Sequence, residues 1–383
     1  MRPCFFYLSS IPVCRFHFFI QKKLHFFDKH HPVIMAENRE VTIYDIARHL
    51  NISAATVSRG LNNNPAVSKN TRKKITEAAQ KLGYQSNTFA SSLRSKSTHT
   101  LGVLVPRLNS HFMSSVLAGM EKAANKHGYN LIIAQSLEEA ENEKQNADTM
   151  FNKRVDGLLI SLAYDTSNLN HLEPFFKRNI PVVFFDRVQS HTSSISVVIN
   201  NYEAAYKITS HLIDQGCRRI MHIGGNVLRN VYKDRFEGYR QALKDHDLPF
   251  QEKWHLVTAL SEEDGTAAAN HILGFPASKR PDAVFCANDT SAVYCMMALK
   301  AAGFRIPEDI AFAGFNNDPI SKVIEPNLTT VDYSGETMGN TAVTNLINHL
   351  KGISNLYSTN SITLRANLII RASSLKKVAG SKK

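Results

Sequence analysis

The stretch VTIYDIARHLNISAATVSRGLN, residues 41–62, predicts two short helices joined by a tight turn. Thr42 is suited to cap a first helix, in which apolar residues recur every three or four positions. Asn51 tolerates the left-handed backbone that a tight turn requires, and Ser53 is suited to cap the second helix. Together these features predict a helix-turn-helix arrangement for this part of the chain.

The second predicted helix has an inner and an outer face. Val57 and Leu61 would face the core. Small or hydrogen-bonding side chains surround one arginine on the opposite face: Ala54, Ala55, Ser58 and Arg59. A helix with so little bulk can enter a DNA major groove. The alternative is an ordinary helical hairpin on a protein surface, which would show the same caps.

The next fifty residues extend the pattern. Ser68 is suited to cap a third helix over 69–82, with basic residues in its first turns, and Gly83 would end it. A serine-rich segment follows at 88–97, which predicts a marginal helix with Leu93 almost alone as an apolar residue.

The ordered motifs TIYDIA (42–47), ATVSRGLN (55–62), VSKNTRKKI (67–75), LGYQSN (82–87) and ASSLRS (90–95) resemble the lactose/galactose/purine repressor (LacI/GalR) family of bacterial transcription factors. The resemblance continues to about Arg371. It implies an N-terminal all-α helix-turn-helix DNA-binding domain at 41–86 and a hinge helix at 87–98. It also implies an α/β periplasmic-binding-protein-like core at 99–371, made of two doubly wound parallel-sheet subdomains with crossovers near 200, 330 and 356. A basic tail at 372–383 would follow.

The resemblance also implies DNA contacts. Ser58 and Arg59 would read base edges, with Ala54 and Ala55 against bases or thymine methyls. Thr42, Ser53, Thr56 and Lys69 are candidates for phosphate contacts, which supply affinity and register. In the hinge, Asn87, Ala90 and Leu93 would contact DNA, with Leu93 inserted into the minor groove.

Charge is unevenly distributed along the 383 residues. Of the net charge of +12, about +4 lies in 1–34, +6 in 35–98, −2 in 99–371 and +4 in 372–383. A basic module on a near-neutral body is typical of a polyanion-binding unit attached to a small-ligand domain. The five cysteines have no C-x-x-C or metal-ligand spacing, which favours free thiols in a reducing cytoplasm.

Residues 1–34 mix phenylalanine clusters with histidine and lysine, without a helical or strand period. They could be a poor secretion signal, but Arg15 and His17 interrupt the apolar region and no small-residue cleavage site follows. Met35 immediately precedes the helix-turn-helix motif. We therefore expect an over-extended translation start, with an unstructured arm as the alternative. No run of the chain reaches the roughly eighteen apolar residues of a membrane helix.

From Thr100 onward, short apolar strands alternate with amphipathic helices, which predicts parallel sheets covered on both faces. Ligands in such folds bind beyond the carboxyl ends of the strands. The residues there, read with the resemblance, give a candidate effector site: Phe112, Asp186, Arg187, Arg229, Arg235, Asn288, Asp289 and Asn316. An aromatic face and paired polar groups suit a sugar. The three arginines suggest an acidic sugar, although relatives that bind neutral sugars also carry arginine here.

Each of these residues also has a purely structural interpretation. Asp186 and Asp289 could cap following helices, Arg235 could be a surface cation, and Phe112 could belong to the core. Asn316 stands where relatives often have aspartate, and His111 departs from the loop that is usual in the family.

The sequence carries no nucleophile elbow, Walker loop, zinc-protease motif or complete dinucleotide-binding fingerprint, so we expect neither an enzyme nor a cofactor or metal site. The preferred hypothesis is a homodimeric repressor of carbohydrate-utilisation genes in the bacterial cytoplasm, associated with the nucleoid. It would bind a near-palindromic operator in double-stranded DNA, respond to a sugar-like effector and have no membrane partner. The alternatives are an extracytoplasmic sugar-binding protein and a sugar-processing enzyme. Four questions stay open: the identity of the effector, whether it is an inducer or a corepressor, whether the protein represses or activates transcription, and the operator sequence.

Overall fold

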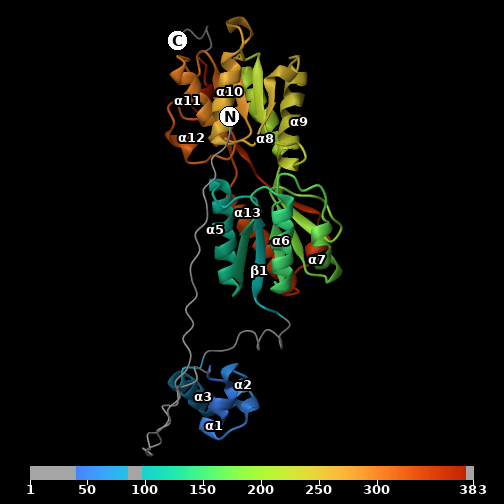
Figure 1. Cartoon of the computed structure of the whole chain (residues 1–383), viewed down its shortest axis with the longest axis vertical. Coiled ribbons are helices and arrows are strands. Elements are labelled where there is room, and N and C mark those ends of the chain that lie inside the picture. Colours follow the sequence, from blue (N-terminus) through green and yellow to red (C-terminus); the bar gives the residue numbers. More distant parts are fainter. Residues whose placement is uncertain (1–39, 85–96, 377–383) are drawn as a thin grey trace, which may run out of the picture. The chain divides into compact units, whose positions relative to one another are not determined.

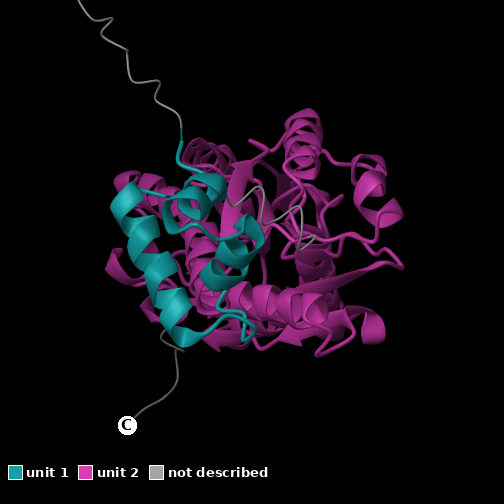
Figure 2. Cartoon of the chain, turned by 90° about the horizontal axis from the view of Figure 1, so that it is seen from below, with its two compact units in different colours: residues 1–86 teal, residues 87–383 magenta. Residues whose placement is uncertain are grey.

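The computed structural model describes residues 40–84 and 97–376. The chain divides into two compact units, residues 1–86 and 87–383, which Figure 2 colours separately. The predictions for residues 1–34 and for Asn87, Ala90 and Leu93 concern residues outside the described part. No helix among the described residues is long and apolar enough to cross a membrane.

The described residues of the first unit, 40–84, form three helices: α1 (Ile43–Leu50), α2 (Ala54–Leu61) and α3 (Lys69–Leu82). Ile46, Val57 and Ile75, one from each helix, are fully buried against one another in its core. Burying each of these side chains contributes about 1.5–3 kcal/mol. At Gly60 a side chain would collide with Ile75, so α2 and α3 pack closely there.

The predicted boundaries of these helices are confirmed. Asn51 ends α1 in the left-handed conformation, with φ 52°. The Ser53 hydroxyl accepts a hydrogen bond from the backbone N–H of Thr56 (3.1 Å), and Ser68 caps α3 in the same way. Gly83 closes α3 with φ 71°. At Thr42, the backbone N–H and the hydroxyl both donate to the Asp45 carboxylate.

The second unit contains two parallel sheets (Figure 1). The N-terminal subdomain is built on a sheet with strand order β11-β5-β4-β3-β1-β2. Its strands are β1 (Thr100–Val105), β2 (Asn130–Gln135), β3 (Gly157–Ile160), β4 (Val182–Phe185), β5 (Ser194–Ile199) and β11 (Ser361–Leu364). Its helices are α5 (His111–Lys126), α6 (Ala140–Asn152), α7 (Glu173–Lys177) and α13 (Gly335–Leu350). Neighbouring strand residues such as Leu158 and Leu159 are buried in different cores, so both faces are covered as predicted.

The C-terminal subdomain has the strand order β7-β6-β8-β9. Its strands are β6 (Ile220–Gly224), β7 (His255–Val257), β8 (Ala283–Cys286) and β9 (Ala311–Ala313). Its helices are α8 (Asn201–Asp214), α9 (Asn230–Asp245), α10 (Glu262–Leu273), α11 (Asp289–Ala301) and the short α12 (Ile320–Val323). The chain also forms an antiparallel pair of β10 (Thr330–Asp332) and β12 (Asn367–Ile369), which the sequence did not predict.

The chain passes between the subdomains three times, after β5, after β10 and after β11. The first two crossovers lie near 200 and 330 as predicted. The third does not lie near 356, because β11 at 361–364 still pairs with β5 in the N-terminal sheet. One hydrophobic core includes Val103 of β1 and Phe285 of β8, so apolar packing continues from one subdomain to the other.

The predicted tail from 372 begins inside the body. Ser373 and Ser374 are fully buried. The Ser373 hydroxyl donates to the carbonyl oxygen of Phe312 (2.8 Å) and accepts from the N–H of Thr329 (2.8 Å). The boundary at 372 was therefore wrong, because the short turn Ala372–Ser374 packs beside β9.

Candidate ligand-binding cleft and DNA-binding unit

Helix α2 presents a mainly small and polar outer surface. Ala55 and Arg59 are exposed and Ser58 is half-buried, as the predicted outer face requires. Ala54 differs, since it is half-buried and packs against the core of the unit. Its position at the first residue of the helix turns its methyl group partly toward α1 and α3, so its predicted contact with bases loses support.

The four candidate phosphate ligands differ in their free hydrogen-bonding groups. Lys69 is exposed at the start of α3. The hydroxyls of Ser53 and Thr56 are bonded to each other (2.9 Å), and the Thr42 hydroxyl donates to Asp45 (2.7 Å). A hydroxyl donates only one hydrogen, so Thr42 would have to leave Asp45 to bind a phosphate.

Sequence reasoning did not single out Tyr44 among the candidate DNA-contacting residues of the first unit. Its side chain on α1 is 65 % exposed, more than almost any other large apolar side chain in the described residues. An aromatic residue on the polar face of an amphipathic helix was the available signal.

In the second unit, a cavity of about 650 Å³ opens between the two subdomains. Its volume lies within the roughly 300–1,000 Å³ of typical small-molecule sites. Six of the eight predicted effector residues line it: Phe112, Asp186, Arg187, Arg235, Asn288 and Asn316. Sequence reasoning did not assign Arg107, Glu138, Tyr232, Asp318 and Tyr333, which also line it.

Arg235 is held firmly at the cavity wall. Its guanidinium donates to the side-chain oxygen of Asn201 (2.9 Å) and to the carbonyl oxygen of Ala287 (2.7 Å). It also lies 3.6 Å from the ring centroid of Phe315. Only 3 % of the residue is exposed, so Arg235 is not a surface cation.

Tyr333 connects Arg235 to the aromatic wall. Its hydroxyl accepts from Arg235 (3.4 Å) and donates to Asn316 (3.1 Å), and its ring lies 4.8 Å from that of Phe112. Burial raises the pKa of Tyr333, which therefore remains a neutral donor. The residue stands at the second crossover, where the alternating strand pattern gave no reason to expect a cavity residue.

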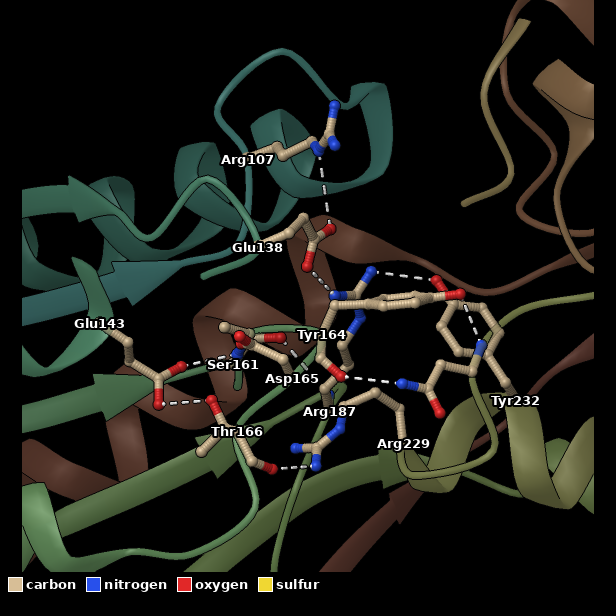
Figure 3. Close-up of polar contacts among 12 residues, drawn as sticks. Arg107, Glu138, Glu143, Ser161, Tyr164, Asp165, Thr166, Arg187, Arg229 and Tyr232 are labelled. Carbon is tan, nitrogen blue, oxygen red and sulfur yellow. Dashed lines mark hydrogen bonds and ion pairs between the residues drawn. The ribbon is translucent and has the colours of Figure 1, made fainter. Parts of the chain in front are cut away.

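A network of ion pairs lies on the opposite wall (Figure 3). The Arg187 guanidinium donates to Glu138 (2.6 Å) and to the Tyr232 hydroxyl (3.0 Å), while Arg107 lies 3.7 Å from the same glutamate. Because Tyr232 belongs to α9, Arg187 joins the two subdomains across the cavity.

Asp186 follows β4 in a left-handed conformation, with φ 57°. No helix follows it before β5, so it does not act as a helix cap. Burial raises the pKa of its carboxyl group, and the guanidinium groups of Arg187 and Arg235 oppose that change. A half-buried carboxyl at the cavity wall can accept hydrogen bonds from ligand hydroxyls.

Asp289 does not line the cavity. It is fully buried, and its carboxyl accepts from the Thr330 hydroxyl and from the backbone N–H of Asp318, both at 2.7 Å. Burial raises its pKa to about 8. The neighbouring Asn288 lines the cavity and also caps α11, accepting from the N–H of Ser291 (2.9 Å). Asp289 thus lies behind the cavity wall, so its predicted contact with the effector loses support.

Arg229 does not line the cavity either. It is buried, and its guanidinium donates to the carbonyl oxygen of Thr166 in the N-terminal subdomain (Figure 3). Beside it, the Tyr164 hydroxyl donates to the carbonyl oxygen of Thr258 (2.6 Å) and accepts from the N–H of Asn226. These cross-cleft contacts of Tyr164 and Arg229 join the subdomains next to the cavity. The predicted contact of Arg229 with the effector therefore loses support.

Glu143 on α6, which is 1 % exposed, forms hydrogen bonds to the loop that carries Tyr164. Its carboxylate accepts from the N–H of Ala163 (2.6 Å) and from the Thr166 hydroxyl (3.0 Å).

The described residues contain no group of three or more histidine, cysteine or acidic side chains placed to hold a metal ion.

Two family sequence models match the chain. "Periplasmic binding proteins and sugar binding domain of LacI family" matches residues 98–376, and "Bacterial regulatory proteins, lacI family" matches residues 42–87. The ribose operon repressor of Haemophilus influenzae is 32% identical over 332 residues, which cover 87% of this chain and 98% of that protein. The HTH-type transcriptional repressor PurR of Actinobacillus pleuropneumoniae serotype 3 is 29% identical with the same coverage.

Solved structures agree with the fold. A complex of the regulator CelR with cellobiose superposes with a TM-score of 0.66 at 25% identity, covering 87% of this chain and 100% of that one. A Lac repressor dimer bound to operator and an anti-inducer gives a TM-score of 0.77 at 24% identity, covering 88% and 100%.

Proposed function

The chain belongs to the lacI family of bacterial regulatory proteins, and from this premise we propose what its cleft binds and how its DNA-binding unit is used. As a member of this family it is a DNA-binding transcriptional repressor controlled by a small-molecule effector. The extracytoplasmic sugar-binding alternative is not favoured, because residues 42–87 match the regulatory family. Its relatives are regulators rather than enzymes.

We propose that the effector is a neutral sugar, and the charge of the cavity wall carries this proposal. Three arginines line the cavity, Arg107, Arg187 and Arg235, against five carboxyl residues, Glu138, Asp186, Glu262, Glu263 and Asp318. All three guanidinium groups already have partners in the protein. An acidic ligand would face the excess of carboxyl groups, which weighs against the acidic sugar that the arginines suggested.

The remaining wall suits a sugar ring. Phe112 and Tyr333 offer aromatic surface, while Asn288, Asn316 and Asp186 offer amide and carboxyl groups within the same cavity. Pyranose and furanose rings have an apolar face and a hydroxylated edge, so this combination can hold both.

On the DNA side, we propose that Arg59, Ser58 and Ala55 read bases and that Lys69 contacts a phosphate. Asn87, Ala90 and Leu93 remain predicted hinge contacts. One unit of three helices covers half of a typical site, so a homodimer would bind a near-palindromic operator. It would act in the bacterial cytoplasm at the nucleoid, on carbohydrate-utilisation genes.

Selection of double-stranded DNA from a random-sequence pool by the purified protein tests the DNA-binding proposal. We expect a near-palindromic consensus, here called the selected operator. Arg59→Ala should lose affinity for it by about 1–3 kcal/mol while keeping its affinity for random DNA. Arg48→Ala is the control, because Arg48 is an exposed arginine of the same unit on α1. Equal losses on both DNAs would show that Arg59 contacts only phosphate.

Thermal unfolding in the presence of D-ribose, cellobiose and D-gluconate tests the effector class. A neutral sugar should raise the unfolding temperature, since a ligand that binds only the folded state stabilises it. Stabilisation by gluconate alone would contradict the proposal.

A further inference from the structure

Asp156 binds the first described residues of the second unit, which follow the DNA-binding unit in the sequence. It lies directly before β3, and its carboxylate accepts from the backbone N–H of Thr98 (2.8 Å) and of His99 (2.9 Å). It also accepts from the Ser97 hydroxyl. The Thr98 hydroxyl adds a bond to the carbonyl oxygen of Arg154 (2.9 Å). Asp156 thus attaches the segment before β1 to the start of β3.

The C-terminal subdomain contains the same arrangement. Asp282 lies directly before β8, and its carboxylate accepts from the backbone N–H of Arg218 (3.0 Å) and of Arg219 (2.8 Å). These residues precede β6, the neighbouring parallel strand. In both subdomains a carboxylate therefore joins the starts of two adjacent strands, and N–H groups that bond to a carboxylate form comparatively strong hydrogen bonds.

The two carboxylates differ in what precedes the segment they hold. Before Arg218 come Cys217, which is fully buried, and α8 of the same subdomain. The segment held by Asp282 is therefore confined on both sides. Before Ser97 the chain leads to the other compact unit, which ends at residue 86. Only the segment held by Asp156 connects the body to the DNA-binding unit.

We propose that Asp156 is a positioning residue that sets where the connecting chain leaves the body, and so limits the reach of the DNA-binding unit. The inference rests on the proposed homodimer on a two-half-site operator. When one unit is bound, the second binds intramolecularly, at an effective concentration set by the length of its tether. Releasing residues 97–99 lengthens that tether and lowers the effective concentration.

The test compares Asp156→Asn with the matched control Asp282→Asn in the full chain. The DNA probes are the selected operator and a duplex with one half-site, measured by fluorescence anisotropy. Asp156→Asn should weaken binding to the operator about 1.4-fold and leave half-site binding unchanged, because a connection of about 12 residues lengthens to about 15 and the effective concentration falls roughly as the −3/2 power of that length. Asp282→Asn should keep the wild-type ratio of the two affinities.

Two further variants guard against a folding defect. Ser97→Ala and Thr98→Val each remove hydroxyl bonds only, and should lower the same ratio by a smaller factor. An unchanged ratio of operator to half-site affinity in Asp156→Asn, or an equal fall of that ratio in Asp282→Asn, would overturn this inference but not the proposed function. If Asp156→Asn does not fold, an unchanged ratio in both hydroxyl variants would overturn it. A wild-type protein that selects no DNA sequence would instead refute the proposed function, and the inference with it.

Discussion

The two subdomains hold their cavity residues by different means. In the C-terminal subdomain, Arg235 and Asn288 are bonded to backbone groups and to buried side chains. In the N-terminal subdomain, Arg187, Glu138 and Arg107 hold one another through ion pairs between long side chains. The Arg107 side chain is 53 % exposed, so this network extends into solvent.

This difference suggests that the C-terminal wall mainly binds the ligand, whereas the N-terminal wall mainly holds the two subdomains together. A wall whose side chains are already ordered loses little conformational entropy when a ligand binds, which favours affinity. The N-terminal wall instead contacts the other subdomain through Arg187 and Tyr232, beside the cross-cleft contacts of Tyr164 and Arg229. These contacts would have to break if the subdomains separated. We therefore expect substitutions on the C-terminal wall to affect binding most, and substitutions at the cross-cleft contacts to affect closure.

The largest effect is expected for Arg235→Gln. It removes the partner of Asn201 and of the Ala287 carbonyl, and each buried polar group left unpaired costs about 1–3 kcal/mol. The variant should lose sugar binding and be destabilised in urea denaturation. Arg280→Gln is the control, because Arg280 bonds to the carbonyls of Phe275 and Leu273 away from the cavity. An unchanged sugar affinity in Arg235→Gln would contradict the expectation that the C-terminal wall affects binding most.

We expect Asp289, behind the C-terminal wall, to make the free energy of unfolding depend on pH. Burial raises the pKa of its carboxyl from 3.8 to about 8. The folded state therefore binds the proton more tightly than the unfolded chain does. The stabilisation that this proton gives the folded state is complete below pH 3.8, the pKa in the unfolded chain. It is lost as the pH rises through about 8, the pKa in the folded protein. The unfolding free energy of Asp289→Asn should lack this decline, which urea denaturation between about pH 5 and about pH 8 measures. Parallel pH profiles of the two proteins would contradict the assignment.

Tyr164→Phe addresses closure. It removes the hydroxyl that bonds Thr258 and Asn226 across the cleft, so the ligand-free protein should scatter X-rays as a more open particle. Tyr239→Phe is the control, since the Tyr239 hydroxyl bonds the Ile220 carbonyl within one subdomain (2.8 Å). Each variant should lose about 1 kcal/mol of stability. Equal dimensions for both variants would show that the contacts of Tyr164 do not determine closure.

The smallest effect is expected for Arg107→Gln. Its ion pair with Glu138 is long at 3.7 Å and its own side chain is 53 % exposed, and ion pairs with a solvent-exposed partner contribute about 0–1 kcal/mol. Sugar affinity should change less than about fivefold, by calorimetric titration. A loss comparable to that of Arg235→Gln would mean that the two walls do not differ as proposed.

The helices of the first unit were predictable because their boundaries depend on neighbours within about four residues. Ser53, Asn51 and Gly83 act on the backbone beside them, so the sequence alone shows their role. The apolar strands of the second unit were also predictable from neighbouring residues, because burial on both faces of a sheet produces a short continuous run of apolar residues. These signals are local.

The site was only partly predictable, because position after a strand does not determine where a side chain points. Asn288 and Asp289 are adjacent, yet one lines the cavity and the other is buried beneath it. Arg229 was expected in the cavity, but it bonds a carbonyl of the other subdomain. Tyr333 and Glu138 enter the cavity through long-range packing that no local pattern reveals.

The most direct measurement of coupling between the cleft and the DNA-binding unit is operator affinity with and without sugar. The full chain would be titrated onto the fluorescent selected operator in the presence of D-ribose or cellobiose, alongside Arg235→Gln. At least one neutral sugar should change the operator affinity by roughly 5–150-fold, as allosteric coupling of ordinary strength does, without changing affinity for random DNA. Arg235→Gln should show no such change. A sugar that stabilises the protein thermally but leaves operator affinity unchanged, or acts equally on Arg235→Gln, would contradict control through the cleft.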